Sequence, residues 1–272
     1  MPVVSAGDGV DDIVQTRNHP LIGETRNTVW VMRSRQLRFL QDRDRRPELM
    51  DQPGIDPAEH RAALVGLRRV NWVSGGVPAI WRELRRLSHG QSQAQPLRVL
   101  DIACGGGDVV IRLAHRAMRE RLPIVLDGCD LSPTAVTVAQ AATARSQLTG
   151  VRFFQHDALG QPLPTDYDVL MCSLFLHHLT DDEAGGSLRN MAAAARRAVL
   201  IDDLLRTRLG FALCWVGCRL LSRSRIVHTD GPLSVRAALT LEEVRDLATR
   251  CGLTSVSLRR HWPERFLLSW SR

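Results

Sequence analysis

Short apolar runs alternate with longer amphipathic segments between Pro96 and Leu204. Each run has the length of a strand, and those at 97–103 and 167–175 are largely apolar, which is typical of strands buried on both faces of a sheet. The expected strands cover 97–103, 124–130, 151–157, 167–175 and 198–204, and the expected helices cover 108–121, 132–146 and 181–197. This alternation predicts an α/β fold with a doubly wound parallel sheet and helices on both faces.

The residues before the alternating region predict a separate helical part. The expected elements are a loose arm at 1–28 and helices at 29–41, 57–73 and 78–87. Asp56 precedes Pro57, a pairing that favours a helix start at this point. We therefore expect residues 1–89 to form an N-terminal arm and a helical cap over a cleft, and residues 90–272 to form the main domain.

After Leu204 the regular alternation of strands and helices ends. We expect an apolar helix at 209–221 and a loop at 223–232. A capping box of Thr240 and Glu243 then predicts the start of another helix. Strands at 254–262 and 265–271 would form a closing hairpin. Residues 206–238 would then be an apolar insertion beside the cleft. The expected loop contains four polar residues: Arg223, Arg225, His228 and Asp230. They could orient a polar group of a ligand, but the favoured interpretation is that they are solvated loop residues.

The composition is that of an ordinary soluble globular protein. Of the 272 residues, 44% are hydrophobic and 24% are charged, which excludes an intrinsically disordered chain. The six cysteines form no Cys-x-x-Cys pair, so neither a zinc site nor a disulfide framework is expected, and a cytoplasmic location is predicted. The first residues lack the basic start and apolar core of a signal peptide.

The net charge of +7 and the pI of about 9.9 permit contact with an anionic partner. The basic residues are all Arg, they are spread along the chain, and no nucleic-acid-binding motif accompanies them. We therefore expect no nucleic-acid partner, and peripheral contact with a membrane surface stays open.

A glycine-rich turn follows the first expected strand in the string VLDIACGGGDVV at 99–110. Gly105 and Gly107 let the backbone approach a ligand, and the helix start offers unpaired N–H groups. In the dinucleotide fingerprint G-x-G-x-x-G, Val110 would occupy the third glycine, and Asp101 would repel a pyrophosphate but attract an ammonium. A phosphate P-loop is excluded because the chain contains no Lys.

The turn and later acidic positions resemble the class I S-adenosylmethionine-dependent methyltransferases. Their first motif is an acid, small residues and G-x-G, which 101–107 matches with Ala103 at the family's first glycine. An acid closes the second expected strand at Asp130, and another follows the third at Asp157. The resemblance implies a Rossmann-like seven-stranded methyltransferase sheet, S-adenosylmethionine as cofactor and methyltransferase activity.

The resemblance also implies which residues hold the cofactor. Asp130 would accept hydrogen bonds from both ribose hydroxyls, Asp157 would face the adenine amino group, and Cys104 would pack beneath the cofactor. Helix capping by Asp130 and a turn role for Asp157 stay open as structural alternatives. The implied cofactor-binding residues are Asp101, Ala103, Cys104, Gly105, Gly107, Asp130, Leu131, Asp157, Ala158 and Ser173.

Two histidines follow the fourth expected strand, at the carboxyl edge where open parallel sheets bind ligands. Because adjacent side chains of an extended segment point in opposite directions, we expect one histidine, His178 or else His177, to face the site as a general base and the other to pack. A purely structural role for the pair is an alternative. Asp202 and Asp203 end the fifth strand at the same edge. No metal is expected.

The insertion indicates what the acceptor is. Phe211, Leu213, Trp215 and Leu220 would give it an apolar wall, which favours a small apolar or aromatic acceptor. The chain resembles ubiquinone- and menaquinone-type methyltransferases, and the strings PELMD, SLFLHHL and HTDGPLSVRAAL resemble methyltransferases of type III polyketide pathways. This resemblance implies secondary metabolism and a phenolic or quinone-like small-molecule acceptor methylated at oxygen.

Two other functions remain open. A nicotinamide-dependent oxidoreductase would fit a Rossmann-like sheet, but the third glycine and a Tyr-x-x-x-Lys dyad are missing, and Tyr167 is the only tyrosine. A nucleic-acid methyltransferase would fit the high pI, but Ser173-Leu174-Phe175 stands where amino-methylating enzymes carry N/D-P-P-Y/F.

Overall fold

The computed structural model describes residues 40–51 and 54–272, and its secondary structure begins near Leu49. The expected arm at 1–28 and nearly all of the expected helix at 29–41 lie outside the described residues. Within the described residues, no helix is both long enough and apolar enough to cross a membrane.

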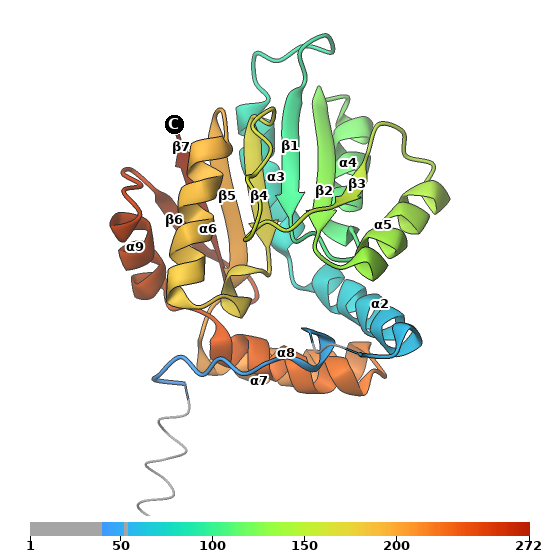
Figure 1. Ribbon diagram of the computed structural model, residues 1–272, viewed down its shortest axis with the longest axis vertical. Helices are drawn as coiled ribbons and strands as arrows, with labels where there is room; N and C mark the ends of the chain where they lie inside the picture. Colours follow the sequence, from blue (N-terminus) through green and yellow to red (C-terminus); the bar gives the residue numbers. More distant parts are fainter. Residues whose placement is uncertain (1–39, 52–53) are drawn as a thin grey trace, which may run out of the picture. The chain divides into compact units, whose positions relative to one another are not determined.

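Seven strands form one sheet in the order β3-β2-β1-β4-β5-β7-β6 (Figure 1). The pairs among β1 to β5 are parallel, and β7 runs antiparallel between β5 and β6. The strands are β1 (Leu97–Ile102), β2 (Ile124–Asp130), β3 (Phe153–Gln155), β4 (Val169–Ser173), β5 (Ala198–Leu204), β6 (Ser257–His261) and β7 (Arg265–Ser271). This topology confirms the predicted seven-stranded doubly wound sheet and its closing hairpin.

The helices cover both faces of the sheet, as the alternation predicts. Helices α3, α4 and α5 lie on one face, and α6 and α9 lie on the other (Figure 1). Their buried side chains form the two main clusters of the core. Helices α2, α7 and α8 lie together beyond the carboxyl ends of the strands (Figure 1). The helices are η1 (Leu49–Asp51), α2 (Pro57–Val73), α3 (Gly76–Leu87), α4 (Asp108–Glu120), α5 (Pro133–Arg145), η2 (Leu176–His178), α6 (Asp181–Ala194), α7 (Arg208–Leu221), α8 (Arg225–Ala237) and α9 (Leu241–Arg250).

Several helices begin at the residues that the sequence predicts, because side chains cap their first turns. The Asp56 carboxylate accepts the N–H groups of Ala58 and Glu59 at the start of α2. Thr240 and Glu243 form the expected capping box of α9. Caps satisfy N–H groups that the helix itself cannot pair, so polar residues at these positions specify the boundary.

Only part of the expected N-terminal cap lies over the cleft. Helix α3 instead belongs to the core of the sheet, where Ile80, Trp81 and Leu84 are buried together with Leu97 and Val99 of β1. The sheet covers the apolar face of α3, and this burial removes the apolar surface from water. Helix α2 is the N-terminal helix that reaches the cleft.

The expectation of a loop at 223–232 is wrong, because α8 spans most of this segment. The letters HTDGP carry the usual turn residues, and Pro232 cannot donate a backbone hydrogen bond inside a helix. Packing outweighs these local preferences, since Ile226, Val227 and Val235 are buried on the inner face of the helix. Tertiary contacts commonly override weak helix propensity in this way.

Two of the four polar residues expected in that loop have structural partners instead. The Asp230 carboxylate is buried and accepts the N–H groups of Leu49 and Met50 at 2.9 and 3.0 Å. His228 Nε2 lies 2.7 Å from the carbonyl oxygen of Ser222. These contacts hold the segment around η1 and the α7–α8 turn against α8.

Gly231→Ala is expected to destabilise the protein by about 1–3 kcal/mol, because the added methyl group overpacks the α7–α8 contact. A Cβ at this position would lie 2.4 Å from Cys218 Sγ and 3.1 Å from Cys214 Sγ. Gly217→Ala is the matched control, because a Cβ there meets nothing within 4 Å and alanine favours a helix. Thermal melts of both variants should show a lower midpoint for Gly231→Ala alone; equal midpoints would contradict the close helix contact.

Candidate functional site

One large cavity of about 1130 Å³ lies at the carboxyl ends of β1, β2 and β4. Strand order reverses between β1 and β4, and open α/β sheets bind ligands at such a reversal. Helices α2, α7 and α8 provide its outer wall. The expected site residues that the structure brings into the cavity wall are Asp101, Ala103, Cys104, Gly105, Asp130, Leu131, Ser173, His177 and His178.

The glycine-rich turn gives one end of the cavity an open backbone. Ala103, Gly105 and Gly107 have φ of 54°, 54° and 74°, in the left-handed region that favours glycine. A Cβ at Gly105 would meet nothing within 4 Å, so this residue faces open space in the wall. Ala103 adopts the conformation at a small steric cost, which explains why glycine suits this position.

Asp130, at the end of β2, accepts the N–H of Gly105 at 2.8 Å and that of Ser132 at 2.9 Å. The carboxylate therefore joins the glycine turn to the start of α5. Its position in the cavity wall fits the expected contact with ribose hydroxyls, and helix capping of α5 comes from the Ser132 hydroxyl instead.

Asp101 is the buried acid beneath the turn. Its side chain is 1% exposed, and its Oδ1 has no hydrogen-bond partner among the described residues. Burial, with the nearby carboxylates of Asp108 and Asp130, raises the pKa of Asp101 well above its ordinary value. An unpaired buried carboxylate is costly, so a cationic ligand group would relieve it. The site therefore fits a cofactor with an ammonium and a sulfonium.

Cys104 is buried under the turn, and its expected contact with the cofactor stays a prediction. It is 7% exposed, and burial together with Asp101 raises the pKa of its thiol well above the ordinary value. A thiol held protonated is a poor nucleophile. Its position next to Gly128, where a Cβ would lie 2.9 Å from Sγ, shows how closely it is packed.

Three expected cofactor residues stand outside the described cavity wall. Gly107 is the N-cap of α4, and a Cβ there would lie 2.7 Å from Phe153. Asp157 Oδ1 accepts the N–H groups of Gly160 and Leu159, which hold the pKa of this carboxyl below its ordinary value. Ala158 is buried in the core. The geometry of Asp157 is that of the turn residue that the sequence left open.

The two histidines do not point in opposite directions, so this step of the sequence argument is wrong. Residues 176–178 form the 3₁₀ helix η2, not an extended segment, and the two rings lie 4.2 Å apart at 33°. Both rings line the cavity. His177 is 3% exposed, whereas the side chain of His178 is 29% exposed.

His177 is oriented by the buried carboxylate of Asp203 at the end of β5. Its Nδ1 lies 2.7 Å from Asp203 Oδ1, and its backbone N–H donates to Oδ2 at 3.1 Å. Burial would raise the pKa of Asp203, but His177 and the N–H of Leu204 outweigh it and lower that pKa. A carboxylate at Nδ1 favours the tautomer with its proton there, which leaves the Nε2 lone pair available.

Glu48 completes this cluster, and it was not predicted. Its carboxylate oxygens lie 3.9 Å from His177 Nε2 and 3.9 Å from His178 Nδ1, and Ser234 Oγ donates to Oε1 at 2.5 Å. The string PELMD, which contains Glu48, resembles related methyltransferases and was the only indication in the sequence.

Glu48, His177 and His178 are also the described residues that could hold a metal ion. One donor atom of each lies within 4.8 Å of the others. Imidazole and carboxylate ligands suit several divalent metals. A metal-binding cluster and a proton-accepting cluster respond differently to a chelator, so experiment can separate the two roles.

Apolar side chains cover the other end of the cavity. Helix α2 contributes Leu64, Leu67 and Val70, and helix α7 contributes Leu213 and Leu220. Both α7 leucines were expected in this wall. Phe211 and Trp215, which were also expected there, are not among the described lining residues.

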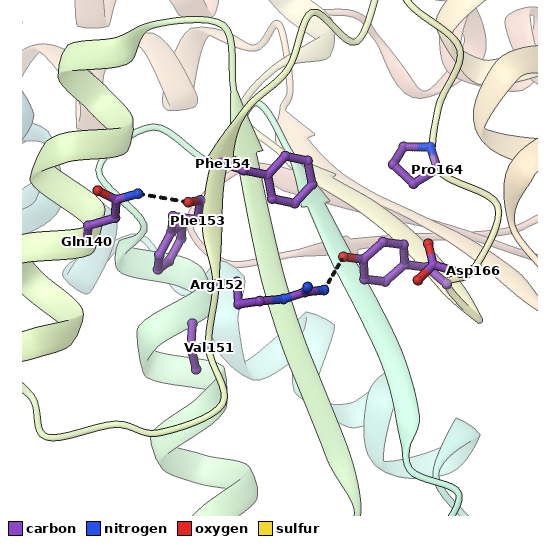
Figure 2. A pocket seen from close by; sticks show the side chains of 8 residues that line it. Gln140, Val151, Arg152, Phe153, Phe154, Pro164 and Asp166 are labelled. Atoms are coloured by element: carbon purple, nitrogen blue, oxygen red, sulfur yellow. Dashed lines mark hydrogen bonds between the residues drawn. The ribbon is translucent and has the colours of Figure 1, made fainter.

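A second pocket, of about 710 Å³, lies beside the edge strand β3 and contains none of the expected site residues (Figure 2). Gln140 donates to the carbonyl of Phe153, and Arg152 donates to the hydroxyl of Tyr167 (Figure 2). Tyr167 in turn donates to buried Asp127 at 2.7 Å, and burial with this bond raises the pKa of Tyr167 to about 12. These partners join β2, β3 and the β4 entry, which indicates a structural network.

Comparison with known proteins shows what the central part of the chain resembles. Residues 99–198 match the family described as a methyltransferase domain. Demethylmenaquinone methyltransferase of Deinococcus radiodurans is 32% identical over 48% of this chain and 52% of that protein. Ubiquinone biosynthesis O-methyltransferase of Leptothrix cholodnii is 36% identical over 44% of this chain and 50% of that protein. The chain thus spans about half the length of these curated relatives.

Solved structures agree on the fold. Magnesium protoporphyrin IX methyltransferase from Synechocystis PCC 6803, with bound SAH, superposes with a TM-score of 0.52 and 18% identity over 90% of this chain and 95% of that chain. The resemblance to the class I S-adenosylmethionine-dependent methyltransferases is thereby confirmed: residues 99–198 match a methyltransferase domain, and the chain has the fold of that class.

Proposed function

We propose that the chain transfers the methyl group of S-adenosylmethionine to an oxygen of a small, apolar, phenolic or quinone-like acceptor. The observation that carries this proposal is the division of one cavity into two ends. The glycine turn and acids form one end, apolar helices α2 and α7 form the other, and the Asp203-oriented His177 also lines the wall. Two relatives named for menaquinone and ubiquinone biosynthesis support a quinone-like acceptor.

The chain's residues hold and align the cofactor end. S-adenosylmethionine supplies a methyl group already activated by the positive sulfonium. Asp130 accepts hydrogen bonds, Gly105 leaves room for close approach, and Asp101 offers a carboxylate to positive charge. Alignment of this kind can lower a barrier by about 7–11 kcal/mol in favourable cases.

At the acceptor end, apolar walls exclude water and His177 takes the proton. Nε2 of His177 accepts the proton of the acceptor hydroxyl as the oxygen attacks, and Asp203 stabilises the imidazolium that results. His178 and Glu48 lie beside this ring and shape the polar corner of an otherwise apolar wall.

A mass-shift screen tests the proposal. Purified protein would be incubated with S-adenosylmethionine and a panel of phenols, hydroquinones, amines and carboxylic acids. We expect a mass gain of one methylene unit on phenols or hydroquinones, accompanied by demethylated cofactor. Methylation confined to amines or to RNA, or oxidation with a nicotinamide cofactor in place of methylation, would overturn the proposed function.

Asp130→Ala is expected to weaken S-adenosylmethionine binding at least tenfold. Hydrogen bonds to a charged group contribute about 1.5–3 kcal/mol, and this variant also releases the N–H of Gly105. Calorimetry would measure the dissociation constant. Asp166→Ala is the control, since that exposed acid pairs with Arg98 and does not line the large cavity. Wild-type affinity in Asp130→Ala would remove this residue from the cofactor site.

A further inference from the structure

The opening of the large cavity is apolar. Four side chains from α2, α7 and the turn before β7 line the cavity and are between 46% and 78% exposed: Val73, Val216, Leu220 and Trp262. A side chain that both lines a cavity and faces solvent lies at its opening. Exposed apolar side chains that cluster in this way mark an interaction surface.

Helix α7 leaves most of its apolar surface uncovered by the described residues. Its sequence, RLGFALCWVGCRLL, is apolar on nearly every side, which is typical of a helix buried all round. Yet Gly210 and Cys218 are its only buried residues in the part of the chain that the structure describes. Leu209 and Trp215 are 53% and 46% exposed, and the guanidinium carbon of Arg219 lies 3.9 Å from the centre of the Trp215 ring. The composition of α7 therefore calls for a further apolar partner.

The outer face of α2 combines arginines with apolar side chains. Val65, Arg68, Arg69 and Trp72 are exposed, and Trp72 is 70% exposed. Their spacing of three and four residues places them on one face of the helix. The opposite face lines the cavity, for example with Leu67. Arginine and tryptophan on the exposed face of a helix are typical of helices that lie in the interface of a lipid bilayer.

A smaller pocket of about 490 Å³ adjoins the opening and carries positive charge. It shares Val73 and Leu221 with the large cavity. Its arginines are Arg68, Arg69, Arg112 and Arg145. Asp108 offsets the charge of Arg112. The other three arginines are exposed, and none of the ion pairs among residues 40–51 and 54–272 includes them. Their charge favours an anionic partner.

We propose that the outer faces of α2 and α7, with the cavity opening between them, form a docking surface for a bilayer that contains anionic lipids. Tryptophan side chains suit the boundary between headgroups and acyl chains, and guanidinium groups bind lipid phosphates. The apolar opening then faces the acyl chains, so an apolar compound passes between bilayer and cavity without crossing water.

A bilayer fits this docking surface better than a second copy of the chain does. Each copy would bring the same exposed arginines to the contact, together with a net charge of +7, and like charges repel. A bilayer supplies both the phosphates and the apolar layer. The proposal goes beyond the proposed function, because no step of methyl transfer depends on it.

Sedimentation with vesicles tests the proposal on the full chain. We expect binding to vesicles of phosphatidylcholine mixed with phosphatidylglycerol to be about 10- to 100-fold stronger than binding to phosphatidylcholine alone, since each arginine near an anionic surface strengthens binding. Added salt should weaken it by screening these charges. Absence of binding, or equal affinity for the two kinds of vesicle, would overturn the docking surface. Either result would leave the proposed function intact, because that is tested on soluble phenols without vesicles.

Arg68→Glu combined with Arg69→Glu is expected to lower the affinity for the phosphatidylglycerol vesicles at least tenfold. Arg245→Glu combined with Arg250→Glu is the matched control, because it changes the net charge equally on α9, where both arginines are exposed and line neither cavity. The control should lose less than about threefold, since salt screens charges that lie away from the bilayer. Equal losses in the two double variants would show a general effect of net charge and would contradict the proposal.

Trp72→Glu and Leu209→Glu test the apolar part of the docking surface, and each should weaken vesicle binding at least tenfold. Met118→Glu is the control, because Met118 is 62% exposed on α4 and lines neither cavity. Unchanged thermal midpoints would show that the variants fold. Sedimentation equilibrium without vesicles completes the test. A wild-type dimer that Trp72→Glu dissolves would show that a second copy covers this surface, and the assignment to a bilayer would be wrong.

Discussion

His177→Ala is expected to lower turnover by about 10²- to 10⁴-fold while leaving the affinity for S-adenosylmethionine nearly unchanged. The ring is held by Asp203 at 2.7 Å through Nδ1, so its Nε2 can accept a proton in the cavity. The defect should shrink as the pH rises, because a phenol that ionises in solution needs no base. Cofactor-saturated turnover between about pH 6 and pH 10 would measure this.

The neighbouring residues supply controls for that experiment. Asp203→Asn removes the carboxylate that orients the ring, and it should lower turnover while cofactor binding persists. Because the pKa of Asp203 lies below its ordinary value, this carboxylate stays ionised throughout the range and does not itself shape the profile. His178→Ala should have the smaller effect, since its side chain is 29% exposed whereas that of His177 is 3% exposed. A larger, pH-dependent loss in His178→Ala would return the base role to that residue.

Treatment with a chelator tests whether Glu48, His177 and His178 bind a metal ion instead. If His177 acts as a base, turnover should survive prolonged chelation. A loss that a divalent cation restores, and that disappears in Glu48→Gln, would show instead that Glu48, His177 and His178 bind a metal. Affinity for the cofactor should be unchanged in either case, which keeps the methyltransferase assignment separate from this question.

The buried strands were the most predictable elements of the fold. β2 and β5 have the predicted bounds, and β1 differs by one residue, because a strand buried on both faces is mostly apolar and stands out from its flanks. β3 is shorter than predicted, because it is an edge strand that pairs with β2 only over Phe153–Gln155. Helix α8 could not be predicted, because its turn-forming residues become helical only when packed against α7.

The candidate site also contains some residues that the sequence could predict and others that it could not. Asp101 and Asp130 lie at the carboxyl ends of β1 and β2, and Gly105 lies in the turn after β1, so their spacing in the sequence places them in the cavity. Glu48 comes from a segment far from β4 in the sequence, and hydrogen bonds such as that from Ser234 hold it there. Long-range contacts of this kind leave no local pattern. The direction of His177 depended on a 3₁₀ turn that the letters LHHL do not distinguish from an extended segment.

Asp101→Asn is expected to weaken S-adenosylmethionine binding by about 10- to 100-fold and at the same time to raise the thermal stability of the unliganded protein. Burial, followed by Asp108, Asp130 and Asp202, raises the pKa of Asp101. The folded protein therefore binds this proton more tightly than the unfolded chain does. Its stability should fall as the pH rises from the ordinary aspartate pKa towards the raised value, and asparagine should remove this dependence.

The same raised pKa links cofactor binding to proton release. A positively charged ligand favours ionised Asp101, so binding should expel a proton wherever the free protein holds one, and affinity should increase with pH up to the raised value. Calorimetry in two buffers with different ionisation enthalpies would count the protons. Asp101→Asn should bind weakly without this proton release, whereas Asp166→Ala should behave as the wild type. Unchanged affinity and unchanged proton release in Asp101→Asn would show that the cofactor's charge lies elsewhere, because a buried carboxyl in contact with a cation cannot remain indifferent to it.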